Sequence, residues 1–181
     1  MNLPNFITLA RLLSVPVAVW LILVGEFAAA FWVFVAAGVS DALDGFIAKR
    51  FDQRTQLGAL LDPIDDKSLL VAVYVTLGVA GELPAWLVIL VVFRDFLIIG
   101  GYLLAHAMAH AMRSEPLIIS KLNTVFQIAL AAATLARLGL RLDAGMWMKT
   151  LVYIVAATTV MSGAGYLVRW TRALAGLEQP S

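Results

Sequence analysis

Residues 85–108 read AWLVILVVFRDFLIIGGYLLAHAM, an apolar run in which Arg94 and Asp95 are the only charged residues. About 20 such residues span the ~30 Å hydrocarbon core of a bilayer as a helix. Similar stretches occur at 7–24, 29–47, 60–79, 119–138 and 147–170. None alternates with the period of a strand, and a helix satisfies its own backbone in lipid. The sequence therefore predicts an all-α protein, one domain over residues 1–181, with a bundle of six transmembrane helices.

The composition of the chain excludes several classes of protein. Of 181 residues, 62% are hydrophobic and 14% are charged, with a net charge of +1. A soluble domain is about 45–50% apolar and about 25% charged. An ordinary soluble protein and a basic nucleic-acid-binding domain are therefore excluded. The absence of cysteine also excludes a disulfide scaffold and a thiolate metal site.

The distribution of basic residues predicts the orientation of the helices. Six crossings place the two termini and the second and fourth connections on one side. That side carries most of the basic residues: Arg11, Lys49, Arg50, Arg54, Arg113, Lys121, Arg169 and Arg172. We therefore expect both termini in the cytoplasm of a bacterial cell, with the chain in the inner membrane. The first stretch is expected to be a retained helix, because it lacks a basic leader and a cleavage site.

Acidic residues are concentrated in one short segment. Six of the 12 lie between positions 41 and 66: Asp41, Asp44, Asp52, Asp62, Asp65 and Asp66. Asp41 and Asp44 share a helix face, as do Asp62 and Asp66, whereas Asp65 lies about 100° away and is expected to pair with Lys67 or face the interface. Charges at membrane depth are costly and usually mark a function. Two adjacent helices would turn both pairs toward one polar cavity, which we expect to face the cytoplasm.

Four convergent carboxylates repel one another unless cations neutralise them. Oxygen ligands of this kind suit Mg²⁺ or Mn²⁺, with Ca²⁺ as an alternative. Two such ions neutralise a diphosphate, and a carboxylate that the metals use least can act as a general base. The residues alone thus predict a metal-dependent transfer of a phosphoryl-type group at the membrane surface.

The acidic segment also resembles a known family signature. Asp41-x₂-Asp44-Gly45-x₂-Ala48-Lys49-x₈-Gly58-x₃-Asp62-x₃-Asp66 is similar to the signature of CDP-alcohol phosphatidyltransferases, with Lys49 where that family has arginine. The resemblance implies six spans and attack of an acceptor hydroxyl on CDP-diacylglycerol, with release of CMP. It also implies a homodimer.

The resemblance implies roles for individual residues. Two divalent cations, Mg²⁺ or Mn²⁺, would be held by Asp41, Asp44, Asp62 and Asp66, and Asp66 would also deprotonate the acceptor. The cytidine diphosphate would be flanked by Gly45, Ala48, Lys49 and Gly58. The N-terminal stretch resembles the cardiolipin synthase and phosphatidylglycerophosphate synthase branch, in which Asn5 and Thr8 could line the nucleotide pocket. Helix capping is an equal alternative for Asn5.

The acceptor is indicated by the fourth and fifth stretches. Arg94-Asp95 and the segment 119–127 resemble the CDP-alcohol-using cardiolipin synthases, which implies phosphatidylglycerol as the acceptor. Glycerol 3-phosphate, the acceptor of phosphatidylglycerophosphate synthases, is the alternative. An arginine inside a span needs an anion. For Arg94 this is either Asp95 or an acceptor phosphate held together with Ser120 and Lys121.

Two other functions fit part of the pattern. A cation-coupled transporter or channel would also have six spans and intramembrane acids. The sequence has neither paired broken helices nor repeated halves, and its acids lie near one membrane face, which argues against transport. A catalytically inactive lipid-binding relative is the other alternative, although all four acids of the signature are intact.

Overall fold

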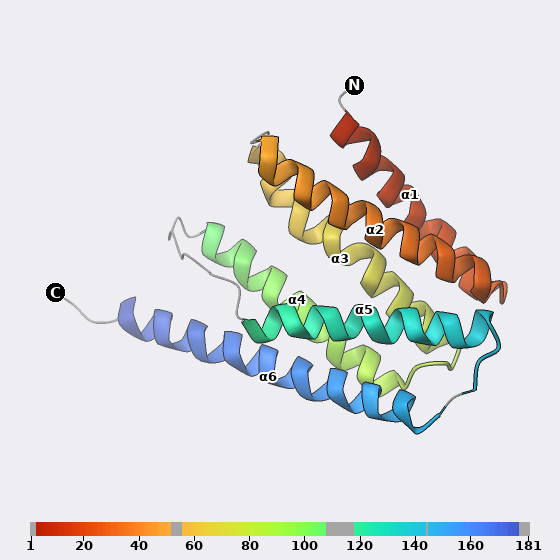
Figure 1. Ribbon diagram of the computed structural model, residues 1–181. Coiled ribbons are helices and arrows are strands. Elements are labelled where there is room, and N and C mark those ends of the chain that lie inside the picture. The colour runs from red at the N-terminus through yellow and green to blue at the C-terminus, as the bar shows by residue number, and fades with distance from the viewer. Residues whose placement is uncertain (1–2, 52–55, 108–117, 144, 178–181) are drawn as a thin grey trace.

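Six α-helices run alternately up and down through one bundle in the described part of the computed structural model (Figure 1). They are α1 (Leu3–Leu23), α2 (Phe27–Phe51), α3 (Gln56–Val79), α4 (Ala85–Ala107), α5 (Ile118–Gly139) and α6 (Met146–Leu177). The structure describes the backbone of residues 3–51, 56–107, 118–143 and 145–177. It describes the side chains of residues 13–40, 67–101, 118–143 and 145–171.

The helix bounds confirm the six stretches expected from hydropathy and correct some of their ends. The second helix continues to Phe51, past residue 47, and the third begins at Gln56, before the expected start at residue 60. Hydropathy detects only the apolar part of a helix, whereas backbone hydrogen bonding continues through the charged residues at its end. Residue 108, the expected end of the fourth stretch, lies outside the described residues.

Two helices end in the same glycine motif at the same end of the bundle. Gly25 and Gly81 have φ angles of 80° and 78°, in the left-handed region that glycine adopts without strain. After α1, the Glu26 N–H donates to the Leu21 carbonyl at 2.9 Å. After α3, the Glu82 N–H donates to the Leu77 carbonyl at the same distance. These bonds satisfy carbonyls that the helix leaves open and reverse the chain tightly.

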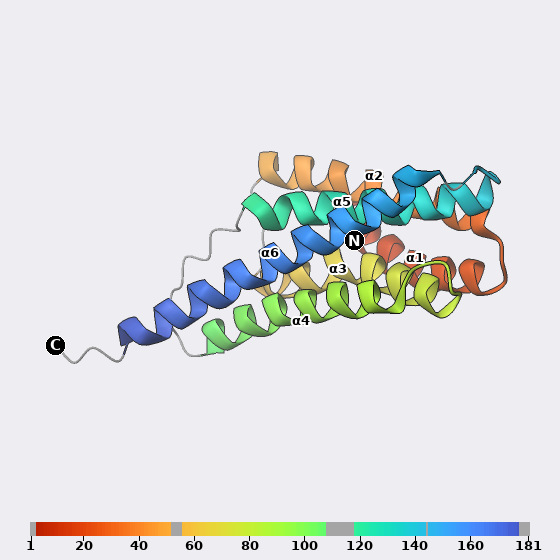
Figure 2. The same ribbon diagram turned by 90° about the horizontal axis from the view of Figure 1, so that it is seen from below.

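The bundle packs around an apolar centre contributed by all six helices. The first helix packs on α2 and α3, α5 packs on α2 and α6, and α4 packs on α3 and α6. Figure 2 shows α6 crossing the bundle obliquely and reaching α4 at one end. The large side chains buried at the centre are Ile22, Phe34, Tyr74, Leu77, Leu87, Val91, Leu130, Leu135 and Val155.

Two described stretches, Ile118–Gly139 and Met146–Thr171, are long and apolar enough to cross a membrane. Shorter apolar helical segments occur at Leu13–Leu23, Phe27–Ser40 and Lys67–Val79. Large apolar side chains also cover the outer faces of the helices. Examples with more than half of their surface exposed are Trp20, Trp32, Ile89, Phe93, Phe96 and Tyr153.

A close contact joins α4 to α6 and gives a prediction. A Cβ atom on buried Gly101 would overlap the indole ring of Trp170, whereas one on Gly100 would meet nothing. Gly101→Ala should therefore cost about 1–3 kcal/mol, because the ring must move. Gly100→Ala should be neutral or stabilise by about 0.5–1 kcal/mol through helix propensity. Thermal unfolding of both variants in detergent measures the difference, and equal midpoints would contradict the contact.

Candidate active site

The four aspartates of the signature lie on two helices. Asp41 and Asp44 belong to the second half of α2, and Asp62 and Asp66 to the first half of α3. The second helix ends, and α3 begins, at the same end of the bundle (Figure 1). Because both segments are helical, each pair lies about one turn apart on a common face. Four carboxylates in this register fit the oxygen ligands that hard divalent cations prefer. Their side chains lie outside the described residues, so their convergence stays a prediction.

Other expected nucleotide-site residues are also placed by backbone alone. Asn5 and Thr8 belong to α1, Gly45, Ala48 and Lys49 to α2, and Gly58 to α3. Their side chains fall outside the described ranges, as does that of Asp65. In the described part of the chain, no three His, Cys, Asp or Glu side chains form a second group that could hold a metal.

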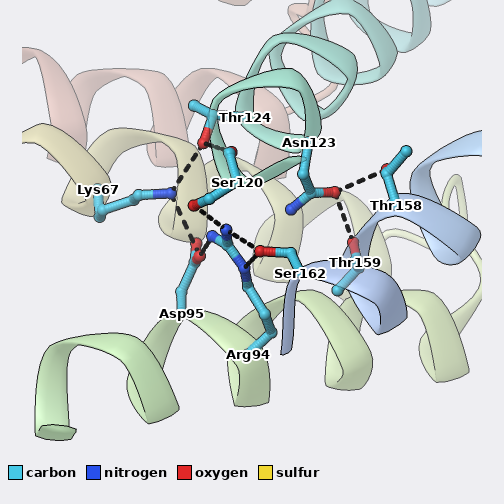
Figure 3. A network of polar contacts seen from close by, with 9 residues as sticks. All are labelled: Lys67, Arg94, Asp95, Ser120, Asn123, Thr124, Thr158, Thr159 and Ser162. Atoms are coloured by element: carbon cyan, nitrogen blue, oxygen red, sulfur yellow. Dashed lines mark hydrogen bonds and ion pairs between the residues drawn. The ribbon is translucent and has the colours of Figure 1, made fainter. Parts of the chain in front are cut away.

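A buried polar cluster centred on Arg94 joins four helices (Figure 3). The guanidinium of Arg94 on α4 donates from Nη1 to Asp95 Oδ1 at 2.6 Å. It donates from Nε and Nη2 to Ser162 Oγ on α6, at 3.1 and 2.6 Å. A further bond runs from Nη2 to Ser120 Oγ on α5. Arg94 thus bonds to its own helix and to the next two.

Lys67 connects α3 to the same cluster. Its ammonium donates to Asp95 Oδ1 at 3.2 Å and to Thr124 Oγ1 on α5 at 3.3 Å. Asp95 Oδ1 therefore accepts hydrogen bonds from both the Lys67 ammonium and the Arg94 guanidinium. Asp95 is only 2% exposed and Arg94 only 3%. Charges this deeply buried require such partners, because a lone ion in a low-dielectric interior is very unfavourable.

The cluster borders a cavity of about 200 Å³ between α3, α4 and α5. Its polar lining consists of Lys67, Arg94, Asp95, Ser120, Lys121 and Thr124, and Ile98 and Ile99 form its apolar wall. Three cations and one carboxylate give this lining a local excess of positive charge. The first turn of α5 also lies there, and a helix N-terminus favours anions. The cavity is therefore chemically suited to a phosphate group.

The structure brings Arg94, Ser120 and Lys121 together, as the sequence grouped them, and pairs Arg94 with Asp95. It adds Lys67, Thr124 and Ser162, which were not identified as site residues. Lys67 directly follows the acidic signature, and Thr124 lies one turn after Ser120 on the same face of α5. Both signals are present in the sequence. Ser162 carries no such signal, because its role depends on how α6 packs against α4.

Comparison with known proteins agrees with the signature. The family model for CDP-alcohol phosphatidyltransferases matches residues 1–170. The chain is 34% identical, over 94% of its length, to "CDP-diacylglycerol--glycerol-3-phosphate 3-phosphatidyltransferase 1, chloroplastic" of Oryza sativa subsp. japonica. It is 32% identical, over 91% of its length, to "Cardiolipin synthase (CMP-forming)" of Homo sapiens.

Coverage of these relatives differs. The chain spans 57% of the rice protein and 60% of the human protein. A shorter relative, "Probable phosphatidylglycerophosphate synthase" of Mycobacterium tuberculosis, is 30% identical over 98% of this chain and 86% of its own length. Because the family model covers nearly the whole sequence, the chain belongs to the CDP-alcohol phosphatidyltransferase family.

Proposed function

We propose that this protein transfers a phosphatidyl group from CDP-diacylglycerol to the hydroxyl of a phosphate-bearing acceptor and releases CMP. The observation that carries the acceptor half of this proposal is the cavity lined by Lys67, Arg94 and Lys121, whose positive charge suits a phosphate. Family membership and the intact acidic signature support the CDP-lipid half.

In the proposed reaction the acceptor oxygen attacks the β-phosphorus of CDP-diacylglycerol. A new P–O bond forms to the acceptor, the P–O bond to CMP breaks, and CMP leaves with the electron pair. Asp66 takes the proton of the attacking hydroxyl. Asp41, Asp44, Asp62 and Asp66 would hold two divalent cations, Mg²⁺ or Mn²⁺. When bound, these ions would neutralise the diphosphate and stabilise charge on the attacking and leaving oxygens.

The cationic cavity positions the acceptor in this proposal. Lys67 and Lys121 attract the phosphate. Arg94 ties α4 to α5, which carries Lys121, and Asp95 ties α4 to Lys67 on α3. Lys67 directly follows Asp66 on α3, so a phosphate bound near Lys67 would lie at the same level of the bundle as the proposed base. Holding both reactants in this way removes much of the entropic barrier to their meeting.

We further propose that all six helices cross the membrane, with both termini and the reaction site at the cytoplasmic face of a bacterial inner membrane. Exposed side chains such as Trp20, Trp32, Ile89 and Phe96 support this proposal, because contact between so large an apolar surface and water is energetically unfavourable. The excess of basic residues at one side supports the orientation. A homodimer follows from the family resemblance alone.

Phosphatidylglycerol is the acceptor we propose, which would make the product cardiolipin. The second candidate is glycerol 3-phosphate, because relatives with both activities in their names align along the chain. The cavity does not choose between them, since both acceptors carry a phosphate.

An assay of CMP release distinguishes these proposals. Purified protein with Mg²⁺ or Mn²⁺ and CDP-diacylglycerol should release CMP only when phosphatidylglycerol is added, and a chelator should stop the reaction. Parallel reactions contain glycerol 3-phosphate or no acceptor. Release with glycerol 3-phosphate alone would replace cardiolipin synthesis by the second candidate. No release with either acceptor would reject both.

A further inference from the structure

Gln127 on α5 is a completely buried side chain whose polar atoms have no hydrogen-bond partner in the described part of the chain. Its exposed fraction is 0%, and neither Nε2 nor Oε1 has a hydrogen-bond partner among the described residues. A carboxamide in an apolar interior is unfavourable unless both of its ends are bonded. The Gln127 side chain has one donor, Nε2, and one acceptor, Oε1, without a partner in the described ranges. A ligand that both donates and accepts hydrogen bonds would satisfy both atoms.

The surroundings of Gln127 are polar on three helices. Asn123, one turn earlier on α5, accepts hydrogen bonds at Oδ1 from Thr158 and Thr159 on α6, each at 2.9 Å (Figure 3). Its Nδ2 has no partner among the described residues, although Asn123 is also fully buried. On α3, the Tyr74 hydroxyl donates to the backbone carbonyl of Gln127 at 3.0 Å. Polar side chains of α3, α5 and α6 therefore gather around this part of α5.

The open carboxamides lie on the same face of α5 as two residues of the cationic cavity. Ser120, Asn123, Thr124 and Gln127 are spaced i, i+3, i+4 and i+7, which places them on one face of α5. Ser120 and Thr124 line the cavity. Gln127 lies three residues beyond Thr124, or about 5 Å farther along the helix axis. Along this face of α5, the carboxamide of Gln127 therefore lies farther into the bundle than the cations of the cavity.

The open atoms define the chemistry of the ligand. An anion would satisfy only the amide N–H groups, and a metal cation would satisfy only the Gln127 oxygen. An acyl chain would satisfy neither. A hydroxyl both donates and accepts, so it can bond to Gln127 Oε1 while accepting from Gln127 Nε2 or Asn123 Nδ2.

We propose that Asn123 and Gln127 form a hydroxyl-binding subsite behind the cationic cavity. The hydroxyl comes from bound water or from the glycerol group of the acceptor. The second source rests on the proposed function, whereas the first does not. In either case the subsite explains why two amide side chains are buried here. A leucine at either position would fill similar space and leave no polar atom without a hydrogen-bond partner.

Gln127→Met tests the acceptor source, because methionine has nearly the same length and no hydrogen-bonding amide. If the acceptor hydroxyl binds there, the KM for the acceptor should rise about tenfold, the cost of roughly one lost buried hydrogen bond. The KM for CDP-diacylglycerol should stay unchanged. Thr134→Val is the matched control, since Thr134 is buried on the same helix but bonds to its own Leu130 carbonyl at 2.8 Å.

The water source is tested on the wild-type protein without substrate. Selective ¹⁵N-glutamine labelling and water-to-amide cross-relaxation report whether a long-lived water contacts the Gln127 side chain. The signal is assigned by its loss in Gln127→Met, or in Gln127→Asn if the first variant does not fold. Unchanged acceptor kinetics together with a water contact would assign the subsite to water.

Unchanged kinetics without a water contact would overturn the proposal. This failure differs from failure of the proposed function, in which wild-type protein releases no CMP with any acceptor. In that case the water measurement still decides whether the subsite exists.

Discussion

Asp66→Asn is expected to reduce CMP release by at least about 10²-fold, the lower range for loss of a general base. Asparagine keeps the shape of aspartate but cannot take the proton of the acceptor hydroxyl. The change should also weaken the proposed divalent-cation site, because one anionic oxygen ligand is lost. CDP-diacylglycerol should still bind, since the other three acids of the signature remain. Turnover and CDP-lipid binding are measured on the same preparation.

Asp65→Asn is the matched control for this variant. Asp65 is the preceding residue on α3 and carries the same charge, but it lies about 100° around the helix. It should retain most of the activity. Full activity in Asp66→Asn would remove Asp66 as the base. Equal losses in the two variants would indicate that net charge, and not position, matters there.

Arg94→Met is expected to destabilise the protein by about 3–5 kcal/mol, as is typical when one partner of a buried ion pair is removed. The substitution leaves the Asp95 carboxylate, only 2% exposed, with Lys67 as its remaining cation among the described residues. It also removes the hydrogen bonds that Ser120 and Ser162 receive from α4. Thermal unfolding in detergent should show the loss directly.

Arg137→Met provides a contrasting control at the other end of the bundle. Arg137 pairs with Glu82 at 2.6 Å, but the two side chains are 23% and 28% exposed. Solvent screens such a pair, so its loss should cost no more than about 1 kcal/mol. The double variant Arg94→Met, Asp95→Leu should recover part of the stability lost in Arg94→Met, because it removes the stranded charge. Similar losses in Arg94→Met and Arg137→Met would contradict the importance of burial.

The helices could be predicted because each depends on local sequence. Apolar runs of sufficient length determine where the helices form, and Gly25 and Gly81 permit the left-handed turns that end α1 and α3. The turn after α5 shows the limit of this reasoning. Arg141 occupies the left-handed region with a φ of 53°, although it is not a glycine. Its conformation is held by the backbone bond from Leu142 to Arg137, which residue preferences do not predict.

The polar cluster was predictable only in part: Arg94, Ser120 and Lys121 were grouped from the sequence, and Asp95 was expected as a partner of Arg94. Asp95 follows Arg94, and an arginine at membrane depth requires an anion, so their pairing was one of two expected outcomes. The bonds to Ser162 depend on how far α6 rotates about its axis against α4, and periodicity does not fix this rotation. Lys67 also bonds to Asp95 and Thr124 on other helices. The expected pairing of Asp65 with Lys67 stays a prediction, because the Asp65 side chain lies outside the described residues.

The adjacency of Arg94 and Asp95 also has a consequence for biogenesis. A helix that enters the membrane during synthesis carries its charges before later helices exist. If α4 crosses the membrane as proposed, it brings a counter-ion for its arginine within the same segment, so the two charges would insert as a neutral pair. Ser120 and Ser162 arrive with α5 and α6 and complete the arginine's hydrogen bonds afterwards. The proposed acceptor end of the enzyme therefore becomes structurally complete only when the last helix has been synthesised and inserted.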